Sequence, residues 1–274
     1  WYGGDDDSDS SGVLKYVRVE FAGRIISPDN ELNGIAFQAV GSGTEIDYLQ
    51  VHQNKDDGVE FFGGSVDVTN LVAVYVRDDS IDIDEGYNGT IQNALVIQQE
   101  NDGDHCIEAD GLGSYSGLDQ PTKDDFIARG LNSAPTINNL TCIVSANEGG
   151  THSDGSGWRL REGIHPVIND SLVISTFGAN DVSDPVDNYC LRIDSSETQD
   201  AAVNGDLQLN QVIFACQEPS RGNAIGAFPD EQAWAESEGN QFATVADGVA
   251  TDPTVAADAD LQLLEVSLAE PPIY

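Results

Sequence analysis

The sequence predicts an all-β chain that folds as a right-handed parallel β-helix, and three observations lead to this prediction. An acidic turn followed by a short strand recurs at residues 56–61, 78–83 and 102–109. The copies are 22 and 26 residues apart, measured from Gly58 to Ser80 and from Ser80 to Cys106. A second type of strand alternates with the first, and the turns are rich in Gly, Asn and Asp. A strand-bearing repeat of this length favours a solenoid whose rungs stack about 4.8 Å apart.

The first strand of each rung alternates between apolar and polar side chains. Such period-two alternation places one set of side chains inside the solenoid and the other outside. We expect Val59, Ile81, Ile107 and Leu160 to lie inside. Segments that fit this strand begin at Gly34, Gly58, Ser80, Cys106, Gly157 and Cys190.

The second strand of each rung has an apolar residue followed, two positions later, by an amide, an acid or a tyrosine. Six segments fit, and a seventh at Leu14 is plausible. The six begin at Ile46, Val68, Ile91, Ile137, Ile168 and Leu209. These polar side chains would then stack up the solenoid as a ladder, which we interpret as structural. Its members are Asn70, Asn93, Asn139, Asp170 and Gln211.

The chain divides into rungs at residues 1–218 and a C-terminal cap or tail at 219–274. Residues 112–134 break the repeat and are expected to loop out of a turn, with further expansions at 176–188 and 195–206. A short helix is expected at 229–235, because Pro begins it and acidic residues occupy its first turn. The chain opens in an acidic loop that leads straight into a strand, so we expect it to be part of a longer precursor or a processed product.

The composition is strongly acidic. Asp and Glu number 48 against 11 Lys and Arg, which gives a net charge of −37 and a pI near 4.1. Such a field repels nucleic acid and anionic membranes and attracts cations such as Ca²⁺. We therefore expect no nucleic-acid partner, and the absence of a long apolar run argues against membrane insertion.

The four cysteines fall into two sequential pairs. In each pair one cysteine lies in a first strand and the other in the next second strand, which suggests disulfides between Cys106 and Cys142 and between Cys190 and Cys216. Four cysteines permit three pairings, and four free thiols remain an alternative. Disulfides would indicate an oxidising compartment.

A column of carboxylates follows the outward side of the first strands. Glu60, Asp82 and Glu108 occupy one position, and Asp84 and Asp110 lie two residues further on. Like charges at the rung spacing repel each other unless a cation or a base lies between them. Calcium takes six to eight oxygen ligands, so we predict that these five residues bind Ca²⁺. The preceding turns add further aspartates at positions 56, 57, 78, 79, 102, 104 and 154.

Arginines continue the same column. Arg159, Arg161 and Arg192 are predicted ligand-binding residues, because a planar guanidinium suits the uronate or sulfate of an acidic polysaccharide. The alternative is that they pair with Glu108 and Asp110 on the neighbouring rung.

A catalytic alternative involves Asp79, Asp82, His105 and Arg161. β-Helices that cleave pectin hydrolyse with paired aspartates or eliminate with Arg or Lys beside Ca²⁺, and these residues are similar. A complete set of acid and base residues is not recognisable, and a shared fold does not establish a function.

Four segments, at residues 12–23, 29–34, 43–51 and 56–64, resemble a family of secreted or lipid-anchored surface proteins that is common in marine bacteria. The resemblance covers about residues 3–218 and implies a right-handed parallel β-helix at the cell surface.

From these observations we expect an extracellular, non-catalytic, calcium-binding module that contacts glycans or neighbouring copies. One alternative is a lyase or glycoside hydrolase acting on acidic polysaccharide. Another is a structural subunit of a surface layer or filament, which self-associates through its open end rungs.

Overall fold

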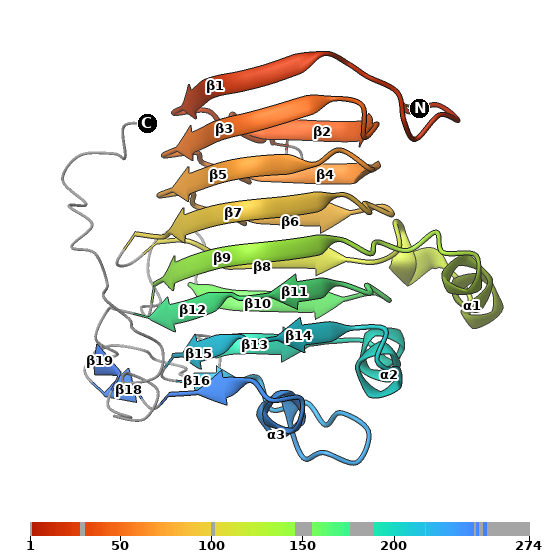
Figure 1. Cartoon of the computed structure of the whole chain (residues 1–274), viewed down its shortest axis with the longest axis vertical. Helices are drawn as coiled ribbons and strands as arrows, with labels where there is room; N and C mark the ends of the chain where they lie inside the picture. Colours follow the sequence, from red (N-terminus) through yellow and green to blue (C-terminus); the bar gives the residue numbers. More distant parts are fainter. Residues whose placement is uncertain are drawn as a thin grey trace.

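The computed structural model describes residues 2–27, 31–99, 102–145, 155–175, 189–216 and 218–243, and the backbone of 245–246 and 249–250. In these ranges the strands stack along one axis (Figure 1). With the N-terminus at the top of Figure 1, the front strands run to the left and the rear strands run to the right. The chain therefore descends as a right-handed coil.

The front sheet, here called the long sheet, contains ten strands among the described residues. In spatial order they are β1 (Val13–Glu20), β3 (Glu45–His52), β5 (Val68–Val74), β7 (Thr90–Ile97), β9 (Thr136–Val144), β11 (Val167–Asn169) with β12 (Leu172–Ser175), β14 (Gln208–Asn210) with β15 (Ile213–Ala215), and β17 (Gln241–Phe242).

The rear sheet, here called the acidic sheet, contains seven strands in the described part of the chain. They are β2 (Ile35–Val40), β4 (Val59–Gly64), β6 (Ile81–Asp84), β8 (His105–Asp110), β10 (Ser156–Arg161), β13 (Tyr189–Ile193) and β16 (Glu218–Ser220). A small antiparallel pair, β18 (Val245–Ala246) and β19 (Val249–Ala250), is separate from both sheets.

The observed pairing confirms the two predicted strand registers. In the long sheet each predicted first residue pairs with its equivalent one rung away, in the series Leu14, Ile46, Val68, Ile91, Ile137, Ile168 and Leu209. In the acidic sheet the second residue of each predicted segment pairs with its equivalent in the same way, in the series Ile35, Val59, Ile81, Ile107, Trp158 and Leu191. Sheet pairing continues past residue 218 through β16 and β17.

The core lies between the two sheets. The four side chains predicted to point inward, Val59, Ile81, Ile107 and Leu160, are all fully buried. Aromatic rings stack from rung to rung, with Phe61 lying 5.3 Å from Phe37 and 4.3 Å from Tyr87 between ring centroids. Each fully buried large apolar side chain contributes about 1.5–3 kcal/mol, so the rungs stabilise one another by stacking.

Each rung of the long sheet bends at one residue in the left-handed backbone region. The φ angles of Asn70, Asn93 and Asn139 are 57°, 59° and 57°. Asn and Asp adopt this conformation more readily than other non-glycine residues, because their short polar side chains can hydrogen-bond locally. The predicted amide ladder therefore follows the bend. In the first rungs two tyrosines, Tyr16 and Tyr48, stack there instead, with 4.8 Å between ring centroids.

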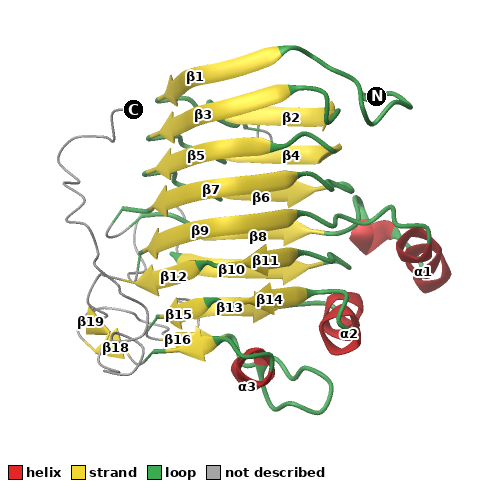
Figure 2. Ribbon diagram, in the orientation of Figure 1, coloured by secondary structure: helices red, strands yellow, loops and turns green. Residues whose placement is uncertain are grey.

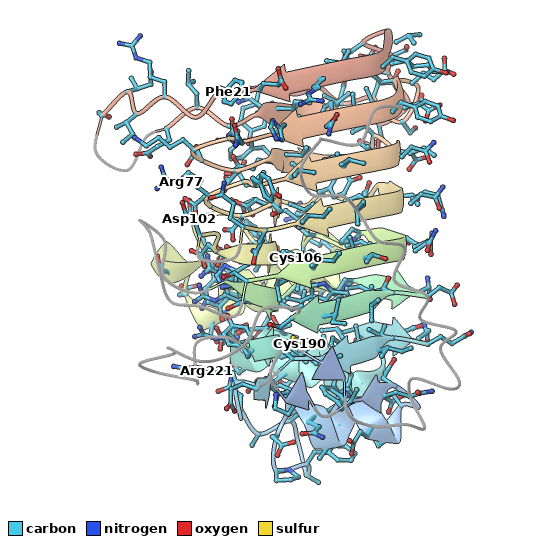
Figure 3. The ribbon with its side chains drawn as sticks, turned by 90° about the vertical axis from the view of Figure 1, so that its left-hand side faces the viewer. Phe21, Arg77, Asp102, Cys106, Cys190 and Arg221 are labelled. Carbon is cyan, nitrogen blue, oxygen red and sulfur yellow. A yellow bond between two sulfur atoms is a disulfide. The ribbon has the colours of Figure 1, made fainter. Side chains whose placement is uncertain are left out.

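Both predicted disulfides are present. Cys106 is joined to Cys142 and Cys190 to Cys216, and each bridge ties the acidic sheet to the long sheet. Figure 3 shows the positions of Cys106 and Cys190 between the sheets.

Helices occupy the interruptions of the repeat (Figure 2). The insertion at 112–134, expected to be a loop, contains η1 (Tyr115–Gly117) and α1 (Gln120–Ala128), and the expansion at 195–206 contains α2 (Ser196–Asn204). The helix expected at 229–235 is α3 (Glu231–Ser237), which starts two residues later because Asp230 caps it through the backbone N–H of Ala233. The expansion at 176–188 and the tail from residue 251 lie outside the described residues.

Candidate functional site

The outer face of the acidic sheet carries the predicted column of charged residues. Strand pairing places Glu60, Asp82, Glu108, Arg159 and Arg192 side by side in this order. The column divides into two halves of different character. Carboxylates dominate the half formed by β4 and β6, and ion pairs dominate the half formed by β8, β10 and β13.

The arginines of the second half are held by carboxylates of their own protein. Arg161 contacts Asp110 through Nε at 2.5 Å and Nη2 at 2.9 Å, and its Nη2 also lies 2.9 Å from Glu108. Arg159 donates to Glu108 at 2.8 Å and to Asp194 at 3.3 Å. Burial lowers the pKa of Arg161, but the hydrogen bond to Asp110 and the charge of Glu108 outweigh it, so the pKa ends above its usual value.

These contacts match the ion-pairing alternative for Arg159 and Arg161. Arg192 likewise lies 2.6 Å from Asp194. The predicted role of the three arginines in ligand binding stays a prediction. It requires a ligand that shares these guanidinium groups with the carboxylates already present.

In the first half, carboxylates crowd together. Oxygens of Asp57, Asp79 and Asp82 all lie within 4.8 Å of one another, and Asp57 also belongs to such a group with Asp56 and Asp78. Neither Asp57 nor Asp82 forms an ion pair with a basic residue in the described part of the chain. This arrangement concentrates negative charge in a small volume.

The cost of this crowding appears in the pKa values. Burial, followed by the charge of Asp79, raises the pKa of Asp57 well above its usual range, and burial with Asp57 does the same for the pKa of Asp82. Glu60 is only 8% exposed, and burial together with Asp84 raises its pKa to about 8. Burial and Asp110 raise the pKa of Asp84 to about 6. The cluster therefore favours either protonation or a bound cation.

His105 connects the carboxylate cluster to the protein interior. Its Nδ1 lies 2.8 Å from Asp79 Oδ1, and its Nε2 lies 3.0 Å from the hydroxyl of Tyr189. Burial lowers the pKa of His105, which favours the neutral ring. A neutral ring that donates from Nδ1 to Asp79 accepts the Tyr189 hydroxyl at Nε2.

The structure brings some of the predicted site residues together and separates others. Of the five predicted calcium ligands, Glu60, Asp82 and Asp84 lie in the first half, whereas Glu108 and Asp110 contact the arginines. Of the four catalytic candidates, Asp79, Asp82 and His105 lie together. Arg161 is on the far side of Glu108, whose Oε1 lies 3.9 Å from His105.

Three residues outside the five predicted calcium ligands contribute to the site. Asp57 and Asp79 lie in the turns before the strands, and Asp79 is also one of the catalytic candidates. Their approach to Asp82 depends on how each turn folds over the strand. The turn aspartates do not all behave alike, because Asp102 pairs with Arg77 at 2.6 Å (Figure 3). Tyr189 gave no signal in the sequence, since only the fold brings it to His105.

Helical insertions border this face at the ends of its strands. In Figure 1, α1 and α2 project from the side toward which the strands of the acidic sheet run. The two insertions contact each other, because the hydroxyl of Tyr115 donates to Glu197 of α2. Lys123 of α1 lies 3.5 Å from the ring centroid of Tyr115.

The fold and this face define a parallel β-helix domain with a charged outer sheet. A family model described as "Pectate-lyase like beta helix domain" matches residues 1–254, and the chain belongs to this family. No curated protein and no solved structure matches the chain significantly. No helix in the described part of the chain is long and apolar enough to cross a membrane.

Proposed function

We propose that this chain is an extracellular, non-catalytic module that binds acidic polysaccharide through calcium held on the acidic sheet. Membership of a pectate-lyase-like family supports a role connected with polysaccharide. The observation that carries the proposal is the group of three carboxylates, Asp57, Asp79 and Asp82, with oxygens within 4.8 Å of one another.

The carboxylate cluster can be neutralised by basic side chains, by protonation or by a bound cation. The neighbouring half of the column uses the first of these. On β8 and β10 the arginines pair with Glu108 and Asp110. Among the residues that the structure describes, the first half of the column offers no such basic partner to Asp57 or Asp82. Protonation would neutralise it at low pH, and a cation would do so at neutral pH.

Calcium fits this donor set better than the other common metals. Its usual ligands are six to eight oxygens in a flexible arrangement, whereas zinc prefers four ligands rich in nitrogen and sulfur. Asp57, Asp79 and Asp82 would hold the ion, with Glu60 beside them. Three protein carboxylates leave further positions for the carboxylate and hydroxyl oxygens of a sugar acid.

The overall charge explains why the ligand would need the cation. At −37 the protein repels an acidic polysaccharide, and this repulsion acts over about a Debye length. A bridging Ca²⁺ replaces it with attraction at one place on the surface. The two disulfides support a location in an oxidising compartment outside the cytosol.

Calorimetric titration of calcium into metal-free protein tests the proposal, followed by binding to polygalacturonate and alginate with calcium or chelator. We expect Asp82→Asn to weaken calcium binding by about tenfold or more, because affinity depends on the number of charged ligands. Asp124→Asn, which removes an equal charge from exposed α1, is the matched control. Equal calcium affinity in both variants, or polysaccharide binding that survives chelator, would contradict the proposal.

A second candidate function is a lyase acting on the same class of polysaccharide. The chain of hydrogen bonds from Asp79 through His105 to Tyr189 favours it, because such a chain can move a proton. Tyr189 is only 2% exposed, which limits its access to a substrate and places this candidate second. Incubation with polygalacturonate or alginate decides the question. Ultraviolet absorbance from unsaturated chain ends, lost in Tyr189→Phe, would establish the lyase.

A further inference from the structure

A groove runs along the bend of the long sheet, on a different face from the acidic sheet. Two adjoining depressions of about 420 and 310 Å³ share Asn139 and Thr141 as lining residues. Each rung contributes the residue at its bend and the residue two positions later. At the rung spacing of about 4.8 Å, the groove therefore repeats a polar bend residue beside a second side chain. The bend residue is an amide except at Asp170, and the second side chain is apolar except at Thr141.

One side of the groove is the amide ladder. Asn93 Nδ2 donates to Asn70 at 3.2 Å, and Asn139 Nδ2 donates to Asn93 at 2.8 Å. An amide has two N–H donors and a carbonyl with two lone pairs. The ladder uses one donor of each of these two asparagines. No protein group in the described part of the chain accepts from the second donor of either asparagine, and both residues are exposed, so this donor can bind a ligand.

The other side of the groove is apolar. Leu95, Leu172 and Ile213 are partly buried and pack on a second hydrophobic cluster, which is separate from the core between the sheets. The groove thus has a hydrogen-bonding wall and an apolar wall that run in parallel. The ring faces and hydroxyl edges of a sugar have the same two-sided character.

The charge of the groove sets it apart from the rest of the protein. Asp170 is the one charged residue among those that line the two depressions in the described part of the chain. The whole protein carries −37. Apart from Asp170, a ligand that approaches here meets neutral side chains, so neither a cationic ligand nor a bridging cation is needed.

We propose that this groove binds a neutral polysaccharide in an extended, β-1,4-linked form, with the chain parallel to the solenoid axis. An extended chain of this linkage advances by close to one rung spacing for each sugar, so each sugar lies over one bend residue and the side chain two positions later. Successive sugars are flipped, so every second sugar presents the same edge to the groove. An added peptide strand fits less well, because the backbone groups of the long sheet are already paired between rungs. The site is independent of the calcium proposal.

Titration with cellohexaose, mannohexaose and xylohexaose tests the inference by calorimetry, with the protein in chelator. We expect at least one of the three to bind. Asn139→Asp should weaken this binding by about tenfold, because the exchange removes an amide donor and adds a charge. Aspartate suits the backbone there, since Asp170 occupies an equivalent bend at φ 50°.

The matched control is Asn169→Asp. Asn169 donates to Asn138 at 2.8 Å in a second amide ladder that does not line the groove, and we expect this exchange to leave affinity within about twofold. As a check that needs no variant, the side-chain amide signals of Asn93 and Asn139 should shift in NMR spectra of the native protein. Absence of binding by all three hexaoses at millimolar concentration would overturn the inference. Equal weakening by both variants, or binding that requires calcium, would also overturn it.

Discussion

Replacement of Glu60 by glutamine tests the electrostatics of the acidic sheet through stability. Burial and Asp84 raise the pKa of Glu60 from 4.5 to about 8. A carboxyl group with a raised pKa in the folded state contributes stability that is present below its unfolded pKa and is lost as the pH rises through the folded pKa. Glutamine stays neutral throughout, and it keeps an oxygen that can accept the hydrogen bond from Asn33.

The magnitude follows from the size of the shift. Glu60 is 8% exposed, so solvent screening removes little of the effect. Each pKa unit corresponds to about 1.4 kcal/mol. The interval from about pH 5.5 to the folded pKa of Glu60 spans about 2.5 pKa units. Metal-free native protein should therefore lose about 3 kcal/mol at this residue between about pH 5.5 and about pH 8.5. The Glu60→Gln variant should not show this loss of stability, because glutamine does not ionise.

Urea unfolding in chelator at the two pH values measures this difference. Both values lie above the pI near 4.1, which keeps the protein charged. Glu236→Gln, on an exposed residue of α3, controls for the removal of one charge. If Glu60→Gln is no more stable than the native protein at the higher pH, the carboxylate at Glu60 is already neutralised and the reasoning is refuted. Calcium should shrink the difference between the variant and the native protein.

Two further predictions concern ion pairing and cross-linking. Arg161→Ala should lower the free energy of unfolding by about 1–3 kcal/mol, between the values for exposed and buried ion pairs, because Asp110 loses its bidentate partner. Urea unfolding at neutral pH measures this loss, and an unchanged midpoint would contradict the prediction. Replacement of Cys106 and Cys142 by serine opens a loop with a sequence separation of 36 residues, so it should cost about 4 kcal/mol through the unfolded chain. A loss below about 1 kcal/mol by the same assay would contradict the second prediction.

The repeat allowed much of the fold to be predicted from the sequence. A strand that slips by one residue exposes its apolar side chains, so apolar positions fix the register. This is why residues such as Ile46 and Val68 pair as expected. The disulfides followed from the same alignment, because it places Cys106 and Cys142 on neighbouring strands.

The repeat did not predict the helices that interrupt it. In α1 all described side chains are at least partly exposed, so the segment lacks the apolar stripe that marks an amphipathic helix. Its local signals are Asp119, which caps the backbone N–H of Thr122, and a proline in the first turn. Such signals also occur in turns, so the sequence alone predicts a loop here.

The sequence predicts a single column of charged residues, and the structure divides this column into a carboxylate half and an ion-paired half. The order from Glu60 to Arg192 followed from the register. The sequence did not show that Arg161 reaches back to Asp110 and Glu108, or that Asp57 and Asp79 approach Asp82. Long side chains and turns have several conformations that fit one register, and only packing selects among them.

A crystal structure of the protein with calcium in excess tests the central claim most directly. We expect anomalous density for a calcium ion coordinated by oxygens of Asp57, Asp79 and Asp82, at distances of about 2.3–2.6 Å. Water alone at this cluster, or calcium bound elsewhere with these three carboxylates unliganded, would contradict the claim.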